Sequence, residues 1–346
     1  MKRRFIYGVL TSCLVLLSLT ACSSSNAENS QTQATASSAA KTEKNETSYP
    51  LEIKITDSEG KEHQQTFEKA PEKVVTNNLS SIEILLELGL KDKIVGTTQP
   101  DNKFTGKFAD DVKDIPVIGD KMTVSKEKVA EYAPDIVVGR AMPFTDDSMG
   151  SVNTLNDLGI QTYIQTASNM TDNPPLTTVI DDVRTLGKIF NVNDQAEKYA
   201  QELEERYQAV QEQVKANKGD EKLTLLPMVA FDAEKSSFSV FNISGGLQSD
   251  LLKQLNVSPA LEGSTSDPTL ETIISSDPDI ILYVTADRNA ELDKTAVKNI
   301  KSEELLKDVS AIKENRIYTT TYDDFMDYGP RIFDTLEMLG NKLYTE

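Results

Sequence analysis

The chain repeats one pattern at two distant places, and this repeat limits its possible folds more than any other feature. The first copy covers residues 123–138 and the second covers residues 267–282. Each copy predicts a short helix with Thr123 or Asp267 as its N-cap, which ends at a Pro-Asp pair and leads into an apolar, β-branched strand. Two such units predict two lobes of the same build.

Each copy also carries one glutamate seven residues before its proline, Glu127 in the first and Glu271 in the second. On a helical wheel these carboxylates lie nearly opposite the apolar side chains of Val129 and Ile273, so we expect both to face water. A glutamate in a first helical turn can simply favour the helix dipole. Because the two occupy matched positions in two lobes, we favour a paired docking role.

The N-terminus predicts export from the cytoplasm. Three cations at 2–4 precede an apolar run over 5–19, which is too short for a typical membrane span. The run ends in Leu-Thr-Ala-Cys, which resembles the lipobox of bacterial lipoproteins and implies a signal peptide over 1–21 and a lipid on Cys22. The alternative is an ordinary signal peptide with an incidental cysteine. Since Cys13 is the only other cysteine and is removed with the signal, the mature chain has no disulfide.

The segment after the lipobox is polar. Residues 23–48 contain almost no large apolar side chain, so they cannot form a core, and we expect a disordered tether over 22–48. Such a tether lets a folded body move above its lipid anchor. Removal of the three signal-peptide cations changes the net charge from -19 to -22. A chain this acidic is not expected to bind nucleic acid.

The rest of the chain alternates apolar strands with amphipathic helices, which predicts an α/β fold with mostly parallel sheets. An edge hairpin is expected over 51–67. We divide the body into an N-terminal lobe over 49–176, one connecting helix over 177–218 and a C-terminal lobe over 219–346. The connecting stretch has helical apolar spacing over an unusual length and contains no proline.

Six further phrases follow the lipobox and the tether in a specific order. They are APEKVVTNN (70–78), LLELGLKDKIVG (85–96), EKVAEYAPDIVV (127–138), ETIISSDPDIILYV (271–284), NRIYTTTYDDF (315–325) and YGPRIFDTLEMLG (328–340). In this order they resemble the binding lipoproteins of ABC importers for ferric siderophores, haem and cobalamin. The resemblance implies two Rossmann-like α/β lobes joined by one long α-helix, a ligand cleft between the lobes and little hinge closure. It also implies that Glu127 and Glu271 each dock an arginine pocket of a membrane permease.

Three arginines are the first candidates for ligand binding. In an open parallel sheet, ligands meet residues at or just past the carboxyl ends of strands. Arg140, Arg288 and Arg331 each follow an expected strand. A guanidinium suits a planar or delocalised anion, such as a carboxylate, catecholate or hydroxamate of a ferric chelate. Each arginine could instead form an ordinary ion pair on the surface of this acidic chain.

Aromatic and amide side chains near the strand ends supply further candidates. Aromatic faces can cover the organic part of a chelate, although each aromatic residue alone is more often part of a core. The asparagines can equally be helix caps. The candidates are Phe144, Tyr322, Phe325 and Tyr328 among the aromatic residues, and Asn78 and Asn242 among the amides.

Other ligands and other classes of protein fit the sequence less well. The only histidine, His63, lies in the edge hairpin and is expected to be solvated, so direct metal binding finds little support. Haem, with Met142, Met326 or Tyr322 as an axial ligand, is a minor alternative. The resemblance implies that cobalamin binders of the family tend to use tryptophan, which this chain lacks.

An extracellular enzyme is the weaker alternative, because the sequence has no Gly-x-Ser-x-Gly elbow, no Cys-His pair and no phosphate-binding glycine loop. A sensor or adhesin is also compatible with the tether. We expect a non-catalytic, monomeric protein without a cofactor, held outside the cytoplasm by its lipid anchor alone. We expect it to capture a ferric siderophore and to deliver it to the permease of an ABC importer.

Overall fold

The computed structural model describes residues 45–169, 173–219, 222–243, 245–261 and 268–345, and residues 45–346 form one compact unit. The expected signal peptide, the lipidation site Cys22, most of the tether and Asp267 lie outside the described residues. No helix in these ranges is both long enough and apolar enough to cross a membrane.

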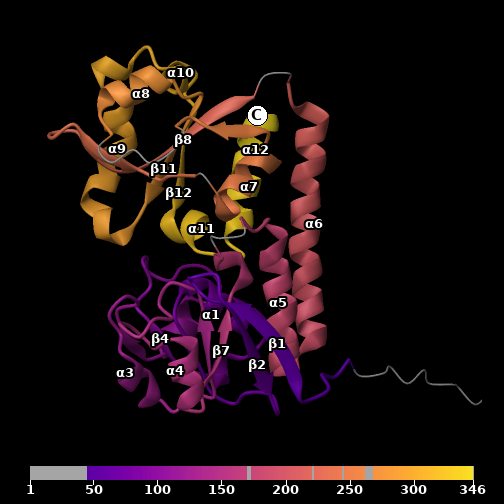
Figure 1. Ribbon diagram of the computed structural model, residues 1–346. Helices are drawn as coiled ribbons and strands as arrows, with labels where there is room; N and C mark the ends of the chain where they lie inside the picture. Colours follow the sequence, from indigo (N-terminus) through magenta and orange to yellow (C-terminus); the bar gives the residue numbers. More distant parts are fainter. Residues whose placement is uncertain (1–44, 170–172, 220–221, 244, 262–267, 346) are drawn as a thin grey trace, which may run out of the picture. The chain divides into compact units, whose positions relative to one another are not determined.

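The N-terminal lobe, indigo to magenta in Figure 1, is built on a sheet of five parallel strands in the order β5-β4-β3-β6-β7. Its central strands β3 and β6 are fully buried, as expected for a parallel sheet covered on both faces. The strands are β3 (Val74–Thr76), β4 (Ile94–Thr98), β5 (Val117–Gly119), β6 (Ile136–Gly139) and β7 (Gln161–Ile164). The helices are α1 (Leu79–Glu87), α2 (Ala109–Val112), α3 (Lys126–Ala130) and α4 (Val152–Asp157), with short 3-10 turns at Lys91–Lys93 and Thr166–Ser168.

The expected edge hairpin forms from β1 (Leu51–Thr56) and β2 (Glu62–Phe67), which pair antiparallel and pack beside β7. His63 in this hairpin is not solvated, contrary to expectation. Only 9% of its side chain is exposed, and its Nε2 lies 2.7 Å from Oδ2 of Asp57.

The C-terminal lobe contains a sheet in the order β10-β8-β11-β12, all parallel, with β9 pairing antiparallel to β8. The two lobes therefore share a parallel α/β core, as the repeat predicts. The strands are β8 (Leu223–Asp232), β9 (Ser237–Val240), β10 (Val257–Pro259), β11 (Ile280–Thr285) and β12 (Ile317–Thr321). The helices are α7 (Gly246–Gln254), α8 (Leu270–Ser276), α9 (Ala290–Ser302), α10 (Ser310–Lys313), α11 (Tyr322–Met326) and α12 (Ile332–Tyr344), with 3-10 turns at Asp287–Asn289 and Glu304–Leu306.

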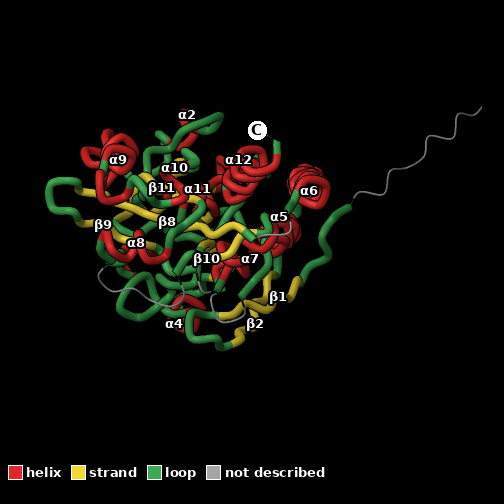
Figure 2. Tube along the Cα trace, turned by 90° about the horizontal axis from the view of Figure 1, so that it is seen from above, coloured by secondary structure: helices red, strands yellow, loops and turns green. Residues whose placement is uncertain are grey.

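The stretch expected as one connecting helix over 177–218 forms two helices instead. They are α5 (Thr177–Phe190) and α6 (Asn193–Asn217), and the chain turns back between them at Asn191, which has a left-handed φ of 55°. A Cβ atom on Gly187 would lie 2.2 Å from Cβ of Ala196, so the two helices approach closely only because this residue is glycine. Figure 2 shows α6 beside both α5 and α12, so α6 packs against a helix of each lobe.

Candidate functional site

Hydrogen bonds between loops at the strand ends join the two lobes. Asn102, after β4, donates from Nδ2 to Oδ2 of Asp323, after β12, at 2.6 Å. Lys103 donates its backbone N–H to Oδ2 of Asp287, after β11, at 2.8 Å. The carboxyl ends of strands from both sheets therefore meet at one seam, where an open α/β sheet binds its ligands.

Two of the predicted residues, Arg288 and Tyr322, are in contact at this seam, and Arg140 and Tyr328 lie near enough for their charges to act on Tyr322. The centre of the Arg288 guanidinium lies 5.0 Å from the centroid of the Tyr322 ring, and Nζ of Lys121 lies 5.9 Å from it. Both distances fit cation–π interactions. The Phe241 ring lies 6.0 Å from Tyr322, centroid to centroid. We call the following residues the cleft cluster: Asp101, Lys121, Arg140, Arg288, Tyr322 and Tyr328.

The charges of the cleft cluster act on its two phenols. Burial raises the pKa of Tyr322, Asp101 raises it further, and Arg140 and Arg288 oppose the rise. Burial also raises the pKa of Tyr328, against the lowering effect of Arg140. Both hydroxyl groups therefore stay protonated at neutral pH, and that of Tyr322 can donate a hydrogen bond to an anionic ligand.

The backbone of Arg140 is held by two hydrogen bonds, whereas Nε of its guanidinium has no hydrogen-bond partner among the described residues. Its N–H donates to Oδ1 of Asn77 at 2.8 Å, and its carbonyl accepts from Nδ2 of the same residue at 3.1 Å. Gly139 makes this possible, because a Cβ there would lie 1.8 Å from Oδ1 of Asn77. The side chain of Arg140 is buried, with the residue only 6% exposed.

The buried guanidinium of Arg140 has no carboxylate partner among the residues the structure describes. Among the described residues its Nε makes no hydrogen bond, and Nη2 lies 3.7 Å from Sδ of Met122. A buried cation without an anion is unfavourable, so the position suits a group that receives an anion from outside. Arg140 lines a cavity of about 210 Å³ with neighbours from both lobes and the hairpin: Asp57, Ser58, Ala141, Met142, Ser168, Asn169 and Tyr328.

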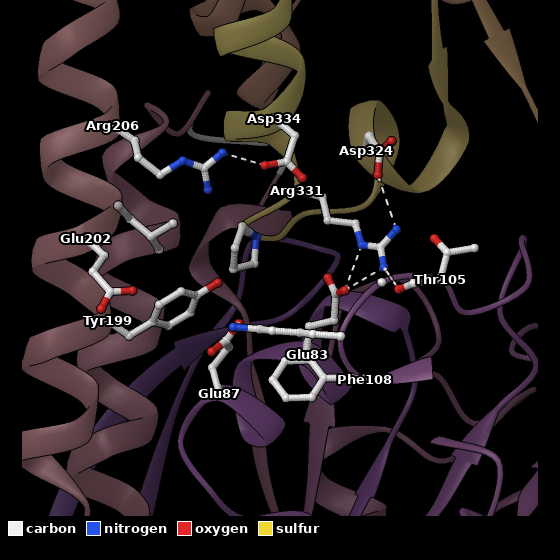
Figure 3. A pocket seen from close by; sticks show the side chains of 14 residues that line it. Glu83, Glu87, Thr105, Phe108, Tyr199, Glu202, Arg206, Asp324, Arg331 and Asp334 are labelled. Atoms are coloured by element: carbon white, nitrogen blue, oxygen red, sulfur yellow. Dashed lines mark hydrogen bonds and ion pairs between the residues drawn. The ribbon is translucent and has the colours of Figure 1, made fainter. Parts of the chain in front are cut away.

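Arg331 is not brought together with Arg140. It lines a separate cavity of about 480 Å³ beside α6 (Figure 3), where Nε and Nη2 each lie 2.7 Å from Oε1 of Glu83. Nη1 lies 3.3 Å from Oδ1 of Asp324. The charge of Arg331 is therefore paired with carboxylates of the protein itself, and its pair with Glu83 joins the two lobes. This supports the alternative that Arg331 forms an ordinary ion pair and is not a ligand contact.

The structure places three other predicted ligand residues away from any free binding surface. Phe144 and Phe325 are 3% and 0% exposed and belong to the core. Asn78 is buried and donates from Nδ2 to Ser80, Gln165 and Asp327, so its amide is used within the protein. The remaining candidate amide, Asn242, is exposed in the loop after β9.

Sequence reasoning missed Lys121 and Asp101. Asp101 follows β4, an expected strand, so the rule that selected the arginines applies to it as well, whereas Lys121 follows β5, which the sequence pattern does not predict. The strand β5 has only three residues and was not recognised as a strand. Within the described ranges, no group of three or more His, Cys, Asp or Glu side chains could hold a metal ion.

Residues 74–323 match the family model described as periplasmic binding protein. The chain belongs to the periplasmic binding protein family. This confirms the resemblance seen in the sequence, and it agrees with the expectation of a binding protein and not an enzyme.

Three relatives of this periplasmic binding protein are similar over most of their length. An uncharacterized ABC transporter substrate-binding lipoprotein of Bacillus subtilis is 24% identical over 297 residues, 84% of this chain and 86% of the relative. A cobalamin-binding protein of Halobacterium salinarum is 23% identical and covers 84% and 74% of the two chains. An iron(3+)-hydroxamate-binding protein of Bacillus subtilis is 23% identical and covers 75% and 76%. A periplasmic binding protein of Veillonella parvula, solved by crystallography, has the same fold, with a TM-score of 0.73, 20% identity, and coverage of 86% and 93%.

Glu127 and Glu271 occupy matched, solvent-exposed positions on the two lobes of this periplasmic binding protein. Each is the second residue of its helix, α3 or α8. The N-caps are Ser125 and Thr269, not Thr123 and Asp267 as expected, so both helices begin two residues later. Hydrogen bonds from the glutamates' own backbone N–H groups, and then from the cap hydroxyls, lower the pKa of both carboxyls. Both therefore carry a negative charge at neutral pH.

Proposed function

We propose that this chain is the lipid-anchored substrate-binding protein of an ABC importer, which captures a ferric siderophore outside the cytoplasm and delivers it to the membrane permease. The observation that carries the proposal is the buried, unpaired guanidinium of Arg140 at the seam of the two lobes, beside Tyr322 and Tyr328. The protein catalyses no reaction, and its chemistry is recognition.

The cleft cluster suits a ferric chelate for three reasons. A guanidinium pairs with the delocalised negative charge of chelating oxygens. The protonated phenol of Tyr322 can donate a further hydrogen bond to the same oxygens. The ring faces of Tyr322 and Phe241 provide apolar surface for the organic part of the ligand.

The relatives support the proposed class of ligand without deciding its chemistry, because one is named for iron(3+)-hydroxamate and one for cobalamin. Haem and cobalamin remain the alternative ligands in the same importer class. The absence of tryptophan disfavours cobalamin, and the unpaired cation at Arg140 favours an anionic chelate.

Delivery requires a surface that a permease can recognise, and we assign this role to Glu127 and Glu271. Both side chains are exposed, ionised and equivalent in the two lobes, which suits two arginine pockets on a two-part permease. We further propose that a lipid on Cys22 holds the protein at the membrane.

Tyrosine fluorescence tests the proposal, since the chain has no tryptophan. The purified chain is titrated with ferric catecholates, hydroxamates and carboxylates, with haem, and with cobalamin. We expect saturable quenching by a ferric siderophore and none by the iron-free siderophore or by bare ferric ion. An equal response to bare ferric ion would overturn the proposed ligand class, and saturation by haem or cobalamin alone would favour the alternative.

A further inference from the structure

The carboxylate of Asp101 pairs with two cations of the cleft cluster. It pairs with Nζ of Lys121, and its Oδ1 lies 3.4 Å from Nη1 of Arg288. The side chains of Asp101 and Lys121 are only 15% and 14% exposed, whereas that of Arg288 is 55% exposed. One anion is therefore held between two cations at the edge of the seam.

Two cations converge on the place that this carboxylate fills. Lys121 and Arg288 both stack on the ring of Tyr322, so their charges converge at one point instead of spreading over the surface. Arg140 lowers the pKa of the same phenol, and within the described part of the chain its Nε makes no hydrogen bond. Two cations thus lie over the Tyr322 ring, and Asp101 is the carboxylate paired with both of them.

We propose that Asp101 is an internal substitute for the ligand's anionic group, which displaces it from Lys121 and Arg288 when the ligand binds. The inference rests on the proposed function and narrows it, because it requires a chelate with several negative charges, such as a ferric catecholate or carboxylate. An uncharged chelate gains too little from Lys121 and Arg288 to replace a carboxylate.

The surrounding loop allows this exchange without separating the lobes. Asn102 and Lys103, the next two residues, are held to the C-terminal lobe by hydrogen bonds to Asp323 and Asp287. The backbone N–H of Asp287 also donates to Oδ1 of Asn102, at 3.0 Å. Since these bonds do not involve the carboxylate of Asp101, a change in its side-chain rotamer is sufficient to free Lys121 and Arg288.

The test measures binding of iron-free citrate, a small trianion, and of two ferric complexes, a trianionic triscatecholate and an uncharged trishydroxamate. The wild-type chain is compared with Asp101→Asn, which keeps the shape of the side chain and removes its charge. Asp114→Asn removes the same charge from an exposed position and is the matched control. Arg288→Gln removes one of the two cations and, because this side chain is mostly exposed, is expected to fold.

We expect Asp101→Asn to bind citrate and the triscatecholate about tenfold more tightly than wild type, because no internal anion competes. The uncharged complex and the Asp114→Asn control should change less than about threefold. Arg288→Gln should weaken binding of both trianions, and combining it with Asp101→Asn should cancel most of the gain.

Two results would overturn the inference: citrate binding that is equal in wild type and Asp101→Asn, or a gain of the same size in Asp114→Asn. The citrate measurement does not depend on the proposed cargo. If no ferric complex binds any variant but citrate binds Asp101→Asn more tightly, the proposed function fails and the displaceable anion stands. If Asp101→Asn unfolds, weaker citrate binding by Arg288→Gln supports the site and unchanged binding contradicts it.

Discussion

Asp327 of the C-terminal lobe accepts the backbone N–H of Ser80 in the N-terminal lobe at 2.6 Å. Ser80 is the second residue of α1, and the residue at the N-cap position, Asn78, makes no capping bond with its own side chain. The carboxylate therefore satisfies a helix-terminal N–H that has no partner within the helix. Its other oxygen accepts from Nδ2 of Asn78 at 3.1 Å. One lobe thus caps a helix of the other.

Asp327→Ala should lower the free energy of unfolding by about 1–3 kcal/mol, because it removes the cap and leaves buried donors without an acceptor. Urea unfolding followed by circular dichroism measures the change. Asp147→Ala, at an exposed position, is the control and should stay within about 0.5 kcal/mol of wild type. Equal stability of the two variants would show that the bond between the lobes contributes nothing.

Stability should also depend on pH through Asp323. Burial, and then the charge of Asp327, raise the pKa of Asp323 to about 7 in the folded protein. An unfolded aspartate has a pKa of about 3.9. Folding therefore favours the protonated form, so the contribution of Asp323 to stability is fully present below about pH 4 and is lost as the pH rises towards about 7.

Asp323→Asn imitates the protonated acid and removes this dependence. The free energy of unfolding of wild type minus that of the variant should fall by at least about 1 kcal/mol between about pH 4.5 and pH 7. Chemical denaturation at a series of pH values provides the difference. A difference that is constant over this range, or that rises with pH, would contradict the raised pKa.

Substitution of Arg140 should affect ligand binding, whereas substitution of Arg331 should affect stability. Arg140→Gln should weaken binding of a ferric siderophore by about 1.5–3 kcal/mol, the range of a charge-assisted hydrogen bond. Arg331→Gln should lower stability instead, because it leaves Glu83 buried without its partner. Fluorescence titration and thermal unfolding of each variant measure the two effects. Arg206→Gln, on α6, controls for loss of a cation and should bind normally. The opposite pattern would move the ligand to the cavity at Arg331.

The docking assignment predicts a loss of transport without a loss of binding. Alanine at Glu127 or Glu271 should leave ligand affinity and the melting temperature near wild type, because both side chains are exposed. Uptake of a labelled ferric siderophore by cells should fall, and more in the double variant than in either single one. Lysine at both positions should be worse than alanine, since like charges then meet. Normal uptake in the double lysine variant would leave the two glutamates as residues that only favour their helix dipoles.

The sequence was sufficient for the features that depend on local pattern. The repeat over 123–138 and 267–282 predicts two α/β lobes, and the strand-end rule finds Arg140, Arg288 and Tyr322, because apolar periodicity and the polarity of a parallel sheet are both readable along the chain. The local pattern does not show how deeply a single side chain is buried. Phe144 is therefore expected at the cleft from the sequence, but it lies in the core.

Contacts between residues far apart in the chain could not be predicted in this way. Arg331 follows a strand as Arg140 does, but its partner Glu83 lies 248 residues away. The turn at Asn191 was missed for a different reason, since helical spacing continues on both sides of it and only its left-handed backbone ends α5.

A crystal of the protein with a bound ferric siderophore, examined by anomalous scattering at the iron edge, tests the central claim most directly. The account predicts one iron peak at the seam of the lobes, with the chelate in contact with Arg140, Tyr322 and Tyr328 and with no side chain bonded to the iron. An iron peak in the cavity at Arg331 and Glu83, or iron held directly by protein side chains, would contradict it.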